Sequence, residues 1–342
     1  MTRAEQINAF LKNAGWENAN RSFLAGDASL RSYDRVELNG KTAVLMDAPP
    51  PPDPENYLPA QLVNIPQWLL VDDLLKKLGV HSPKVFAHDI ENGFVLLEDL
   101  GDNSFTRMLD GGYDARTLYR MATESLIKIG KDFKISPEKE YVYNKERMMA
   151  DIDHLPNWVV KYVSKVNMTR NEWDEYHDIW SELIDKMQTV PRGPALYDYH
   201  VDNLILTPVN TCGVLDFQDV RTTAATYDIM TLLEDERRLV APDIKQEMMD
   251  LYFGAFPQLN TPEIRSLSQL VALQRHIKVV GQFIRYFYKD GKDKYMKYVP
   301  LVWYLIENCL ENPHTKRLKQ WMDKYVPIEC RERFNPKDAS HA

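Results

Sequence analysis

Three residues in one short stretch of the chain have side chains suited to phosphoryl transfer: Asp198, Asn203 and Asp216. Phosphoryl transfer needs a carboxylate facing the acceptor hydroxyl, together with an amide oxygen and a second carboxylate that hold magnesium on the phosphates. Magnesium takes few protein oxygens and fills its other positions with phosphate oxygens and water. We therefore predict Asp198 as the catalytic carboxylate and Asn203 and Asp216 as the metal ligands.

The spacing of these residues agrees with that assignment. Asn203 follows Asp198 by five positions, as the amide follows the carboxylate in a kinase catalytic loop. Asp216 comes directly after the apolar residues Val214 and Leu215, so a short strand would carry it to its end, within reach of a metal. Asp and Asn are common in turns, and each of them alone would read as an ordinary loop residue.

Length, composition and charge narrow the class of protein. The chain has 342 residues, which favours two lobes over one core. Hydrophobic residues make up 44% and charged residues 27%, as in a folded protein. The formal net charge of −8 argues against a nucleic-acid binder or a protein of anionic membrane surfaces.

The cysteines and the absence of long apolar runs indicate a cytoplasmic protein. Cys212, Cys309 and Cys330 are widely spaced and form no CxxC pair, so neither a disulfide framework nor a zinc site is indicated. We find no apolar run of the ~18 residues that a spanning helix needs, and no signal-peptide core.

Hydrophobic periodicity predicts a strand-rich first lobe at residues 1–100 and a mostly helical second lobe at 101–334, followed by a frayed tail at 335–342. In the first lobe we expect strands at residues 33–38, 42–46, 84–87 and 93–97, and helices within 1–20 and at 65–78. In the second we expect helices at 115–131, 170–189, 225–239, 242–253, 263–288 and 294–310, with short strands in 195–206 and 213–217.

The motifs that carry a family resemblance are D-x-H-x-x-N at Asp198, His200 and Asn203, and D-F-x-D at Asp216 and Asp219. With them, the sequence resembles the aminoglycoside phosphotransferase/choline kinase family over roughly residues 20–310. The resemblance implies an α+β, bilobal, protein-kinase-like fold, with a small antiparallel-sheet N-lobe and a larger, mostly helical C-lobe. It also implies ATP and Mg²⁺ as cofactors.

Five longer stretches are similar to the bacterial amino-sugar kinases within that family; they are residues 26–33, 44–50, 199–203, 232–235 and 274–281. This similarity implies ATP-dependent phosphorylation of the anomeric hydroxyl of N-acetylmuramate or N-acetylglucosamine in peptidoglycan recycling. The expected partners are the sugar and ATP, and the protein would function beside a sugar-phosphate nucleotidyltransferase.

The resemblance also assigns the nucleotide site. The turn at residues 26–32 would cover the phosphates, with Ser29 and Arg31 reaching them, and the backbone of Glu98 and Leu100 would pair with adenine. Met46 stands where the family's phosphate-binding lysine is expected. Arg31 is therefore our candidate for the replacing charge, and a surface salt bridge is the alternative interpretation.

Further residues are assigned supporting or substrate roles. His200 would brace the catalytic loop, Asp219 would lie behind the site, and Asp228 would anchor the loop from below, unless it only caps a helix. Substrate contacts are assigned to three basic residues of the helical lobe: Arg238, Arg275 and Lys278. These residues could instead form a solvated face.

Two alternatives stay open. An aminoglycoside or other small-alcohol kinase would use the carboxylates of residues 234–236 against a cationic substrate. A nucleotide-binding pseudokinase would explain Met46, and also Leu196, which stands where the family commonly has a loop-bracing His. A scaffold would need none of Asp198, Asn203 and Asp216, which weighs against the pseudokinase.

Overall fold

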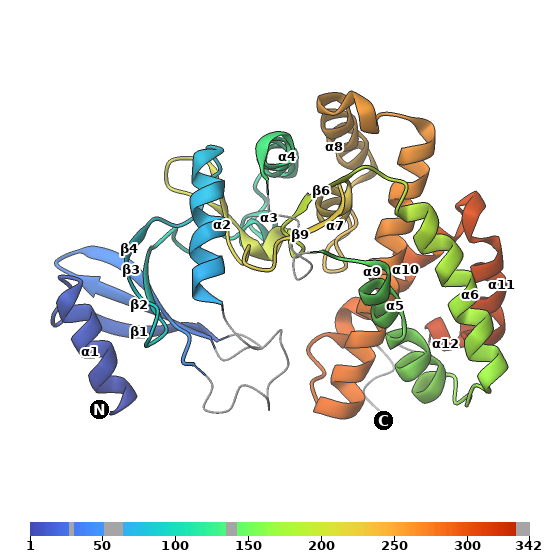
Figure 1. Ribbon diagram of the computed structural model, residues 1–342, viewed down its shortest axis with the longest axis horizontal. Helices are drawn as coiled ribbons and strands as arrows, with labels where there is room; N and C mark the ends of the chain where they lie inside the picture. Colours follow the sequence, from blue (N-terminus) through green and yellow to red (C-terminus); the bar gives the residue numbers. More distant parts are fainter. Residues whose placement is uncertain (27–30, 51–63, 135–141, 333–342) are drawn as a thin grey trace. The chain divides into compact units, whose positions relative to one another are not determined.

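The computed structural model describes residues 1–26, 31–50, 64–134 and 142–332. Within them the chain forms two compact units (Figure 1). The first comprises residues 1–114 and 202–218; the second comprises residues 115–201 and continues from 219. The chain thus returns to the first unit at Asp202, within the predicted catalytic loop, so that Asp198 belongs to the second unit and Asn203 to the first. The assignment of nucleotide to the first lobe and of substrate to the second stays a prediction.

The first unit contains the predicted antiparallel sheet. Its strand order is β1-β2-β3-β5-β4, and neighbouring strands pair antiparallel. The strands are β1 (Asn20–Gly26), β2 (Ser32–Leu38), β3 (Lys41–Asp47), β4 (Val85–Asp89) and β5 (Phe94–Glu98). We did not predict β1, because all seven of its residues are exposed and it lacks the alternation of a half-buried strand.

Two helices belong to the sheet unit. The helix α1 (Arg3–Asn13) begins with a capping box between Thr2 and Glu5. The apolar face of α1 packs on one face of the sheet, and the buried residues of this core are Ile7, Phe10, Leu11, Val36, Ala43, Leu45, Phe94 and Leu96. The helix α2 (Ile65–Lys77) has Asn64 as its N-cap, whose side chain accepts from the Gln67 N–H.

A short hairpin and one small helix complete the first unit. The hairpin consists of β7 (Leu204–Leu206) and β8 (Cys212–Val214), and the helix is α3 (Phe105–Asp110). The Leu206 N–H donates to the Asn103 carbonyl at 2.8 Å, which joins the hairpin to the segment before α3. Gly213 allows a close approach, because a Cβ there would lie 2.8 Å from the Leu100 side chain.

The second unit is mostly helical, as predicted. The helices are α4 (Ala115–Asp132), α5 (Lys145–Ile152), the π-helix η4 (Leu155–Val163), α6 (Arg170–Met187), α7 (Tyr227–Leu233), α8 (Pro242–Ala255), α9 (Pro262–Asp290), α10 (Val299–Leu310), α11 (Lys316–Tyr325) and α12 (Ile328–Glu332). A two-stranded sheet of β6 (Arg192–Ala195) and β9 (Arg221–Ala224) accompanies them.

Two of the predicted helices are shorter than expected. The helix predicted at 225–239 ends at Leu233, and the next three side chains are buried and pair with Lys245, Arg237 and Arg275. The helix predicted at 294–310 begins at Val299, since Pro300 suits the first turn of a helix and disfavours helix before it. We did not predict α3, α5, η4, α11 or α12.

The helix η4 and the long helix α9 approach each other through a glycine. A Cβ on Gly281 would lie 2.4 Å from the carbonyl carbon of His154, a distance that side chains do not tolerate. The glycine therefore lets the two backbones come close, next to the part of α9 that carries charged residues.

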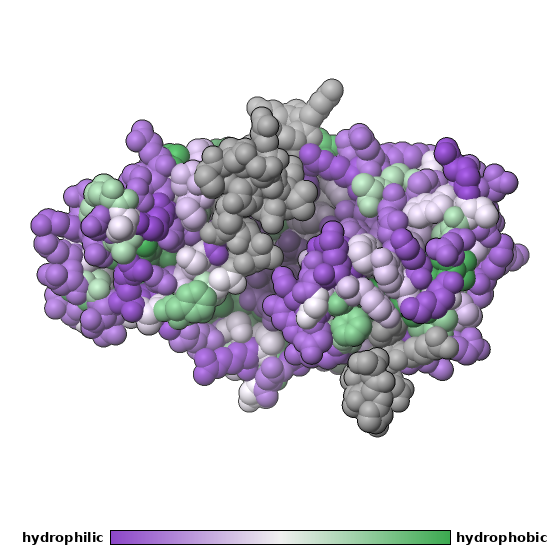
Figure 2. Space-filling view, turned by 90° about the horizontal axis from the view of Figure 1, so that it is seen from below, coloured by the Kyte–Doolittle hydropathy of each residue, from purple (hydrophilic) through white to green (hydrophobic). Residues whose placement is uncertain are grey.

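None of the helices in the described residues has the length and apolarity that crossing a membrane requires. The face drawn in Figure 2 is mostly hydrophilic, with small separate apolar areas. The three cysteines are free and buried.

Candidate active site

The first unit contains a cavity of about 320 Å³ at the end of its sheet. Four of the predicted site residues line it: Glu98, Leu100, Asn203 and Asp216. The other lining residues are Leu24, Ala25, Gly26, Tyr33, Val44, Trp68, Pro83, Leu97, Asp99, Gly101, Ile205, Leu215 and Phe217. Most of these are apolar, and the charged and amide side chains of the lining are Glu98, Asp99, Asn203 and Asp216; a mostly apolar lining with a few polar groups is the composition expected of a small-molecule site.

The β7–β8 hairpin places Asn203 and Asp216 together. Asn203 precedes β7 and Asp216 follows β8, and the Leu215 N–H donates to the Asn203 carbonyl at 2.9 Å. Asp216 has a φ of 55°, a left-handed conformation that is uncommon for a residue other than glycine. The Gln218 amide donates to Asp216 Oδ1 at 2.8 Å. One amide and one carboxylate oxygen form a donor set that fits Mg²⁺.

Arg31 supplies positive charge beside these two residues. Its Nη2 lies 3.1 Å from Asp216 Oδ1, and its side chain is only 7% exposed, so the interpretation as a surface salt bridge is wrong. Met46 lies next to the last residue of β3, paired with Tyr33 and Val95, and is fully buried. Ser29, predicted in the same turn as Arg31, lies outside the described residues.

The segment after β5 is held in place by Arg35, which the sequence analysis missed. The guanidinium of Arg35 donates to Asp99 Oδ2 at 2.7 Å and to Asp102 Oδ1 at 2.8 Å. Hydrogen bonds to Asp102 and Asp99 raise the pKa of Arg35 above its ordinary value. Asp99 also accepts from the Gly101 N–H at 3.0 Å. The signal was available in the sequence: one arginine on a strand, and two acidic residues in the connector that follows another strand.

In the second unit, Asp228 holds the backbone that precedes Asp198. Its carboxylate accepts from the Leu196 N–H at 2.5 Å and the Tyr197 N–H at 3.0 Å. Burial raises the pKa of Asp228 to about 7, although the two N–H groups act against this shift. The helix α7 has Thr226 as its N-cap, so Asp228 does not cap it.

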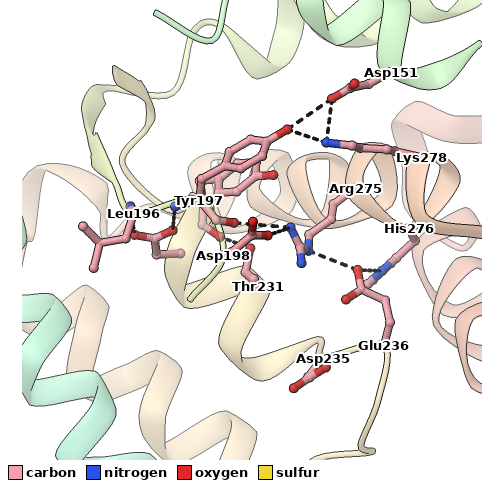
Figure 3. Close-up of polar contacts among 12 residues, drawn as sticks. Asp151, Leu196, Tyr197, Asp198, Thr231, Asp235, Glu236, Arg275, His276 and Lys278 are labelled. Carbon is pink, nitrogen blue, oxygen red and sulfur yellow. Dashed lines mark hydrogen bonds and ion pairs between the residues drawn. The ribbon is translucent and has the colours of Figure 1, made fainter. Parts of the chain in front are cut away.

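The ring of Tyr197 fixes the same loop from the side. It stacks on Tyr227 with centroids 5.3 Å apart, and the Arg221 guanidinium lies 4.6 Å from its centroid. The Tyr197 hydroxyl accepts from Lys278 Nζ and donates to Asp151 Oδ2, as Figure 3 shows. The sequence analysis assigned no role to Tyr197 or Asp151. Tyr197 has a φ of 78°, and these contacts hold that uncommon conformation.

Asp198 faces a buried arginine. Arg275 Nη1 lies 3.6 Å from Asp198 Oδ1, and the side chain of Asp198 stays 39% exposed while that of Arg275 is 6% exposed. Loss of hydration would raise the pKa of Asp198, but the charges of Arg275, His200, Lys278 and Arg237 together outweigh it and lower that pKa below its ordinary value. The carboxylate is therefore ionised at neutral pH and open to solvent on one side.

The remaining predicted residues lie in the second unit. His200 is buried, and Asp219 is half exposed with its carboxylate 3.9 Å from Arg221. Arg238 is half-buried, and its backbone N–H donates to the Asp235 carbonyl. The basic residues of α9 do not form a solvated face, because Arg275 is buried and the side chain of Lys278 is only 13% exposed.

Sequence comparison identifies related proteins. The phosphotransferase enzyme family matches residues 21–262 of the chain. An N-acetylmuramate/N-acetylglucosamine kinase of Caulobacter vibrioides is 28% identical, over 94% of this chain and 96% of that protein. A protein of the same name from Pseudomonas aeruginosa is 30% identical, over 90% of this chain and 92% of its own length.

Solved structures of similar fold are also kinases by name. A choline/ethanolamine kinase family protein from Mesorhizobium loti superposes with a TM-score of 0.62 and 15% identity, over 94% of this chain and all of that one. The ADP-bound aminoglycoside phosphotransferase APH(2'')-Ib superposes with a TM-score of 0.58 and 15% identity, over 89% of this chain and 96% of that one. These likenesses show the protein-kinase-like fold.

Proposed function

The chain belongs to the phosphotransferase enzyme family, and we propose that it transfers phosphate from ATP to the anomeric hydroxyl of N-acetylmuramate and N-acetylglucosamine. The family makes it a phosphotransferase, and the names of the relatives that align along nearly the whole chain support the choice of sugar. The observation that carries the proposal is the cavity where Asn203 and Asp216 meet, with Arg31 beside them.

In the first unit, the residues around the cavity would bind the nucleotide. The backbone of Glu98 and Leu100 would pair with adenine, since both residues line the cavity after β5. Asn203 and Asp216 would hold magnesium, which supplies charge neutralisation on the phosphates. Arg31 would bind phosphate oxygens in place of the strand lysine. Ser29 remains a predicted phosphate contact.

In the second unit, Asp198 would orient the acceptor. Its ionised carboxylate would accept a hydrogen bond from the anomeric hydroxyl and take the proton as the new O–P bond forms. Asp228 and Tyr197 would keep the loop backbone fixed, so that the carboxylate needs little reorganisation to act. His200 and Asp219 would support the loop.

Lys278 and Arg238 are our candidates for contacts to the sugar. Lys278 lies on the same helix as Arg275, and its ammonium group is 3.1 Å from Asp151 Oδ2. A partly exposed ion pair can exchange partners with an anionic substituent such as the carboxylate of N-acetylmuramate. Arg275 suits this role less well, because it is buried and already faces two carboxylates.

The acidic run at residues 234–236 bears on the aminoglycoside alternative. All three side chains are buried, and each lies against a cation of the protein: Lys245, Arg237 and Arg275 respectively. Carboxylates committed to internal partners are poorly placed to bind a polycationic antibiotic. The contacts favour an amino sugar.

We further propose a cytoplasmic enzyme of peptidoglycan recycling. A sugar phosphorylated at its anomeric oxygen is the kind of product that a nucleotidyltransferase extends, so such an enzyme would act next in sequence. Neither nucleic acid nor membrane is needed as a partner, in keeping with the net charge of −8.

The proposal is tested by coupled ADP-release assays of the purified protein with N-acetylmuramate, N-acetylglucosamine, glucosamine, choline and kanamycin. We expect turnover with the two N-acetyl sugars. Asp198→Asn should lower turnover by ~10²–10⁴-fold with ATP affinity unchanged, because the carboxylate acts on the acceptor. Turnover with choline or kanamycin alone would contradict the substrate assignment.

A further inference from the structure

A chain of polar side chains runs through the interior of the second unit behind Asp198. Arg275 Nη1 lies 3.6 Å from Asp198 Oδ1, and Arg275 Nε lies 3.1 Å from Glu236 Oε1. On its other side, Glu236 Oε1 is 3.1 Å from His276 Nδ1. Figure 3 shows the guanidinium between the two carboxylates.

The elements of the unit fix this chain at both ends. Arg275 and His276 are neighbours in the middle of α9, while Glu236 follows the end of α7. The side chains of Glu236 and His276 are 1% and 0% exposed. Arg275 Nη1 also donates to the Tyr197 carbonyl at 3.3 Å, directly beside Asp198 in the sequence. Neither Glu236 nor His276 can therefore reach a substrate, and Arg275 is committed to the loop.

We propose that Arg275 is a positioning residue for phosphoryl transfer: held by Glu236 and His276, its guanidinium fixes the Asp198 carboxylate that faces the acceptor. This inference rests on the proposed function and assigns to Arg275 an internal role in place of a substrate contact. A guanidinium suits the role, because its planar fork can face two carboxylates at once, whereas an ammonium group is a point charge.

The charges around the two carboxylates agree with this role. Asp198 faces Arg275 first, and then His200, Lys278 and Arg237, with Asp228 as the neighbouring acid. Glu236 faces Arg275, His276 and Arg237. Burial alone would raise the pKa of Glu236, but Arg275 and His276 outweigh it, so that pKa is lowered. Arg275 thus makes the largest favourable charge interaction with both carboxylates.

The kinetic test compares wild type, Arg275→Met and Arg275→Lys across pH 5 to 8 with saturating ATP and sugar. Wild-type turnover should stay constant down to about pH 5. The pKa of Asp198 lies below the ordinary value of about 3.9, so the carboxylate stays ionised over this range. Arg275→Met should lose ~10²-fold in kcat with little change in the KM for ATP, and its turnover should fall towards pH 5, because loss of the counter-charge raises the pKa of the buried Asp198 carboxylate. Arg275→Lys should recover the flat profile and part of kcat.

Two outcomes of the kinetic test would overturn the proposal. One is an Arg275→Met profile parallel to that of wild type; the other is an effect confined to the KM for the sugar, which would return Arg275 to substrate binding. Arg317→Met is the matched control, since Arg317 is exposed and pairs with Glu182 on the surface. It should leave kcat and the pH profile unchanged.

A second test needs no substrate, so it separates failure of the inference from failure of the proposed function. Without Arg275, Glu236 is a buried carboxylate lacking its main counter-charge, so the loss of melting temperature in Arg275→Met should widen from pH 5 to pH 8. Adding Glu236→Gln should recover part of the loss at pH 8. A pH-independent loss, or no recovery in the double variant, would overturn the proposal even if no sugar is phosphorylated.

If Arg275→Met does not fold, Arg275→Lys and Glu236→Gln are compared in the same thermal scan. Because an ammonium group can face only one of the two carboxylates well, Arg275→Lys should also lose more melting temperature at pH 8 than at pH 5. A pH-independent loss in Arg275→Lys, or no recovery when Glu236→Gln is added to it, would overturn the proposal.

Discussion

Arg31 Nη2 lies 3.1 Å from Asp216 Oδ1, inside the first unit and nearly closed to solvent. The pair joins the start of β2 to the end of the β7–β8 hairpin, two segments far apart in the sequence. It places a cation beside the carboxylate proposed to hold magnesium, while the strand position of the expected lysine carries Met46. In the proposed nucleotide site the positive charge would thus come from the residue before β2 instead of from strand β3.

Arg31→Ala should raise the KM for ATP and lower turnover. A charge-assisted contact to phosphate contributes on the order of 1.5–3 kcal/mol, which corresponds to roughly tenfold to a hundredfold. Steady-state kinetics with varied ATP measure the effect. Arg21→Ala is the control, because Arg21 on β1 pairs with Asp34 in a partly exposed contact worth under about 1 kcal/mol. Unaltered ATP kinetics in Arg31→Ala would remove Arg31 from the site.

Asp216→Asn should weaken the response to magnesium. Loss of the carboxylate removes the only charged protein ligand in the proposed pair, so half-maximal activity should require at least about tenfold more Mg²⁺. Turnover at fixed ATP is measured against total magnesium. Asp73→Asn, on an exposed ion pair of α2, serves as control. An unchanged magnesium dependence would contradict the metal assignment.

Asp228→Asn should lower both turnover and melting temperature, because an amide can accept from only one of the two loop N–H groups. The difference in stability should also depend on pH. The pKa of Asp228 is raised to about 7 in the folded protein, against about 3.9 when unfolded. The folded state therefore binds the proton more strongly, and wild type loses stability relative to the variant as pH rises from about 4 to 7.

Thermal unfolding between pH 4.5 and 8 checks this: the gap between wild type and Asp228→Asn should narrow as pH rises. Asp243→Asn, an exposed residue at the start of α8 that pairs with Arg116, should show no such trend. A gap that widens with pH would mean that the two N–H groups keep Asp228 ionised and that its pKa is not raised.

Two glycine-to-alanine changes should act in opposite directions. In Gly281→Ala the new Cβ meets the backbone of His154, and overpacking of this kind costs about 1–3 kcal/mol. In Gly254→Ala nothing lies within 4 Å, and the change should stabilise helix α8 by about 0.5–1 kcal/mol. Melting temperatures compare the two. Equal shifts in the same direction would contradict the close packing of η4 on α9.

Local patterns were sufficient to predict most of the first unit. The alternation at residues 33–38 and the apolar run before Glu98 each predict a strand, and the Asn39–Gly40 turn predicts a hairpin. All three features are local, and the structure has all three. The edge strand β1 lacks such a pattern, in keeping with the exposure of all seven of its residues. The chain's return to the first unit at Asp202 leaves no local signal, because it depends on contacts between distant segments.

The candidate site was predictable where the spacing within one loop decides the geometry, as for Asn203 and Asp216. Tyr197, Arg35 and Glu236 were missed or misread because their roles arise from partners more than 35 residues away. The interpretation of the basic residues on α9 as a solvated face was also wrong for Arg275. The fold buries Arg275, and its guanidinium faces two carboxylates.

The most direct test of the account is the position of the phosphate in the product. Incubation with ATP, magnesium and N-acetylglucosamine or N-acetylmuramate, followed by ³¹P NMR with proton coupling, identifies the carbon that carries the phosphate. We expect a phosphorus signal coupled to the anomeric proton, absent with Asp198→Asn. A signal coupled to the protons of carbon 6, or a product formed only from kanamycin or choline, would contradict it.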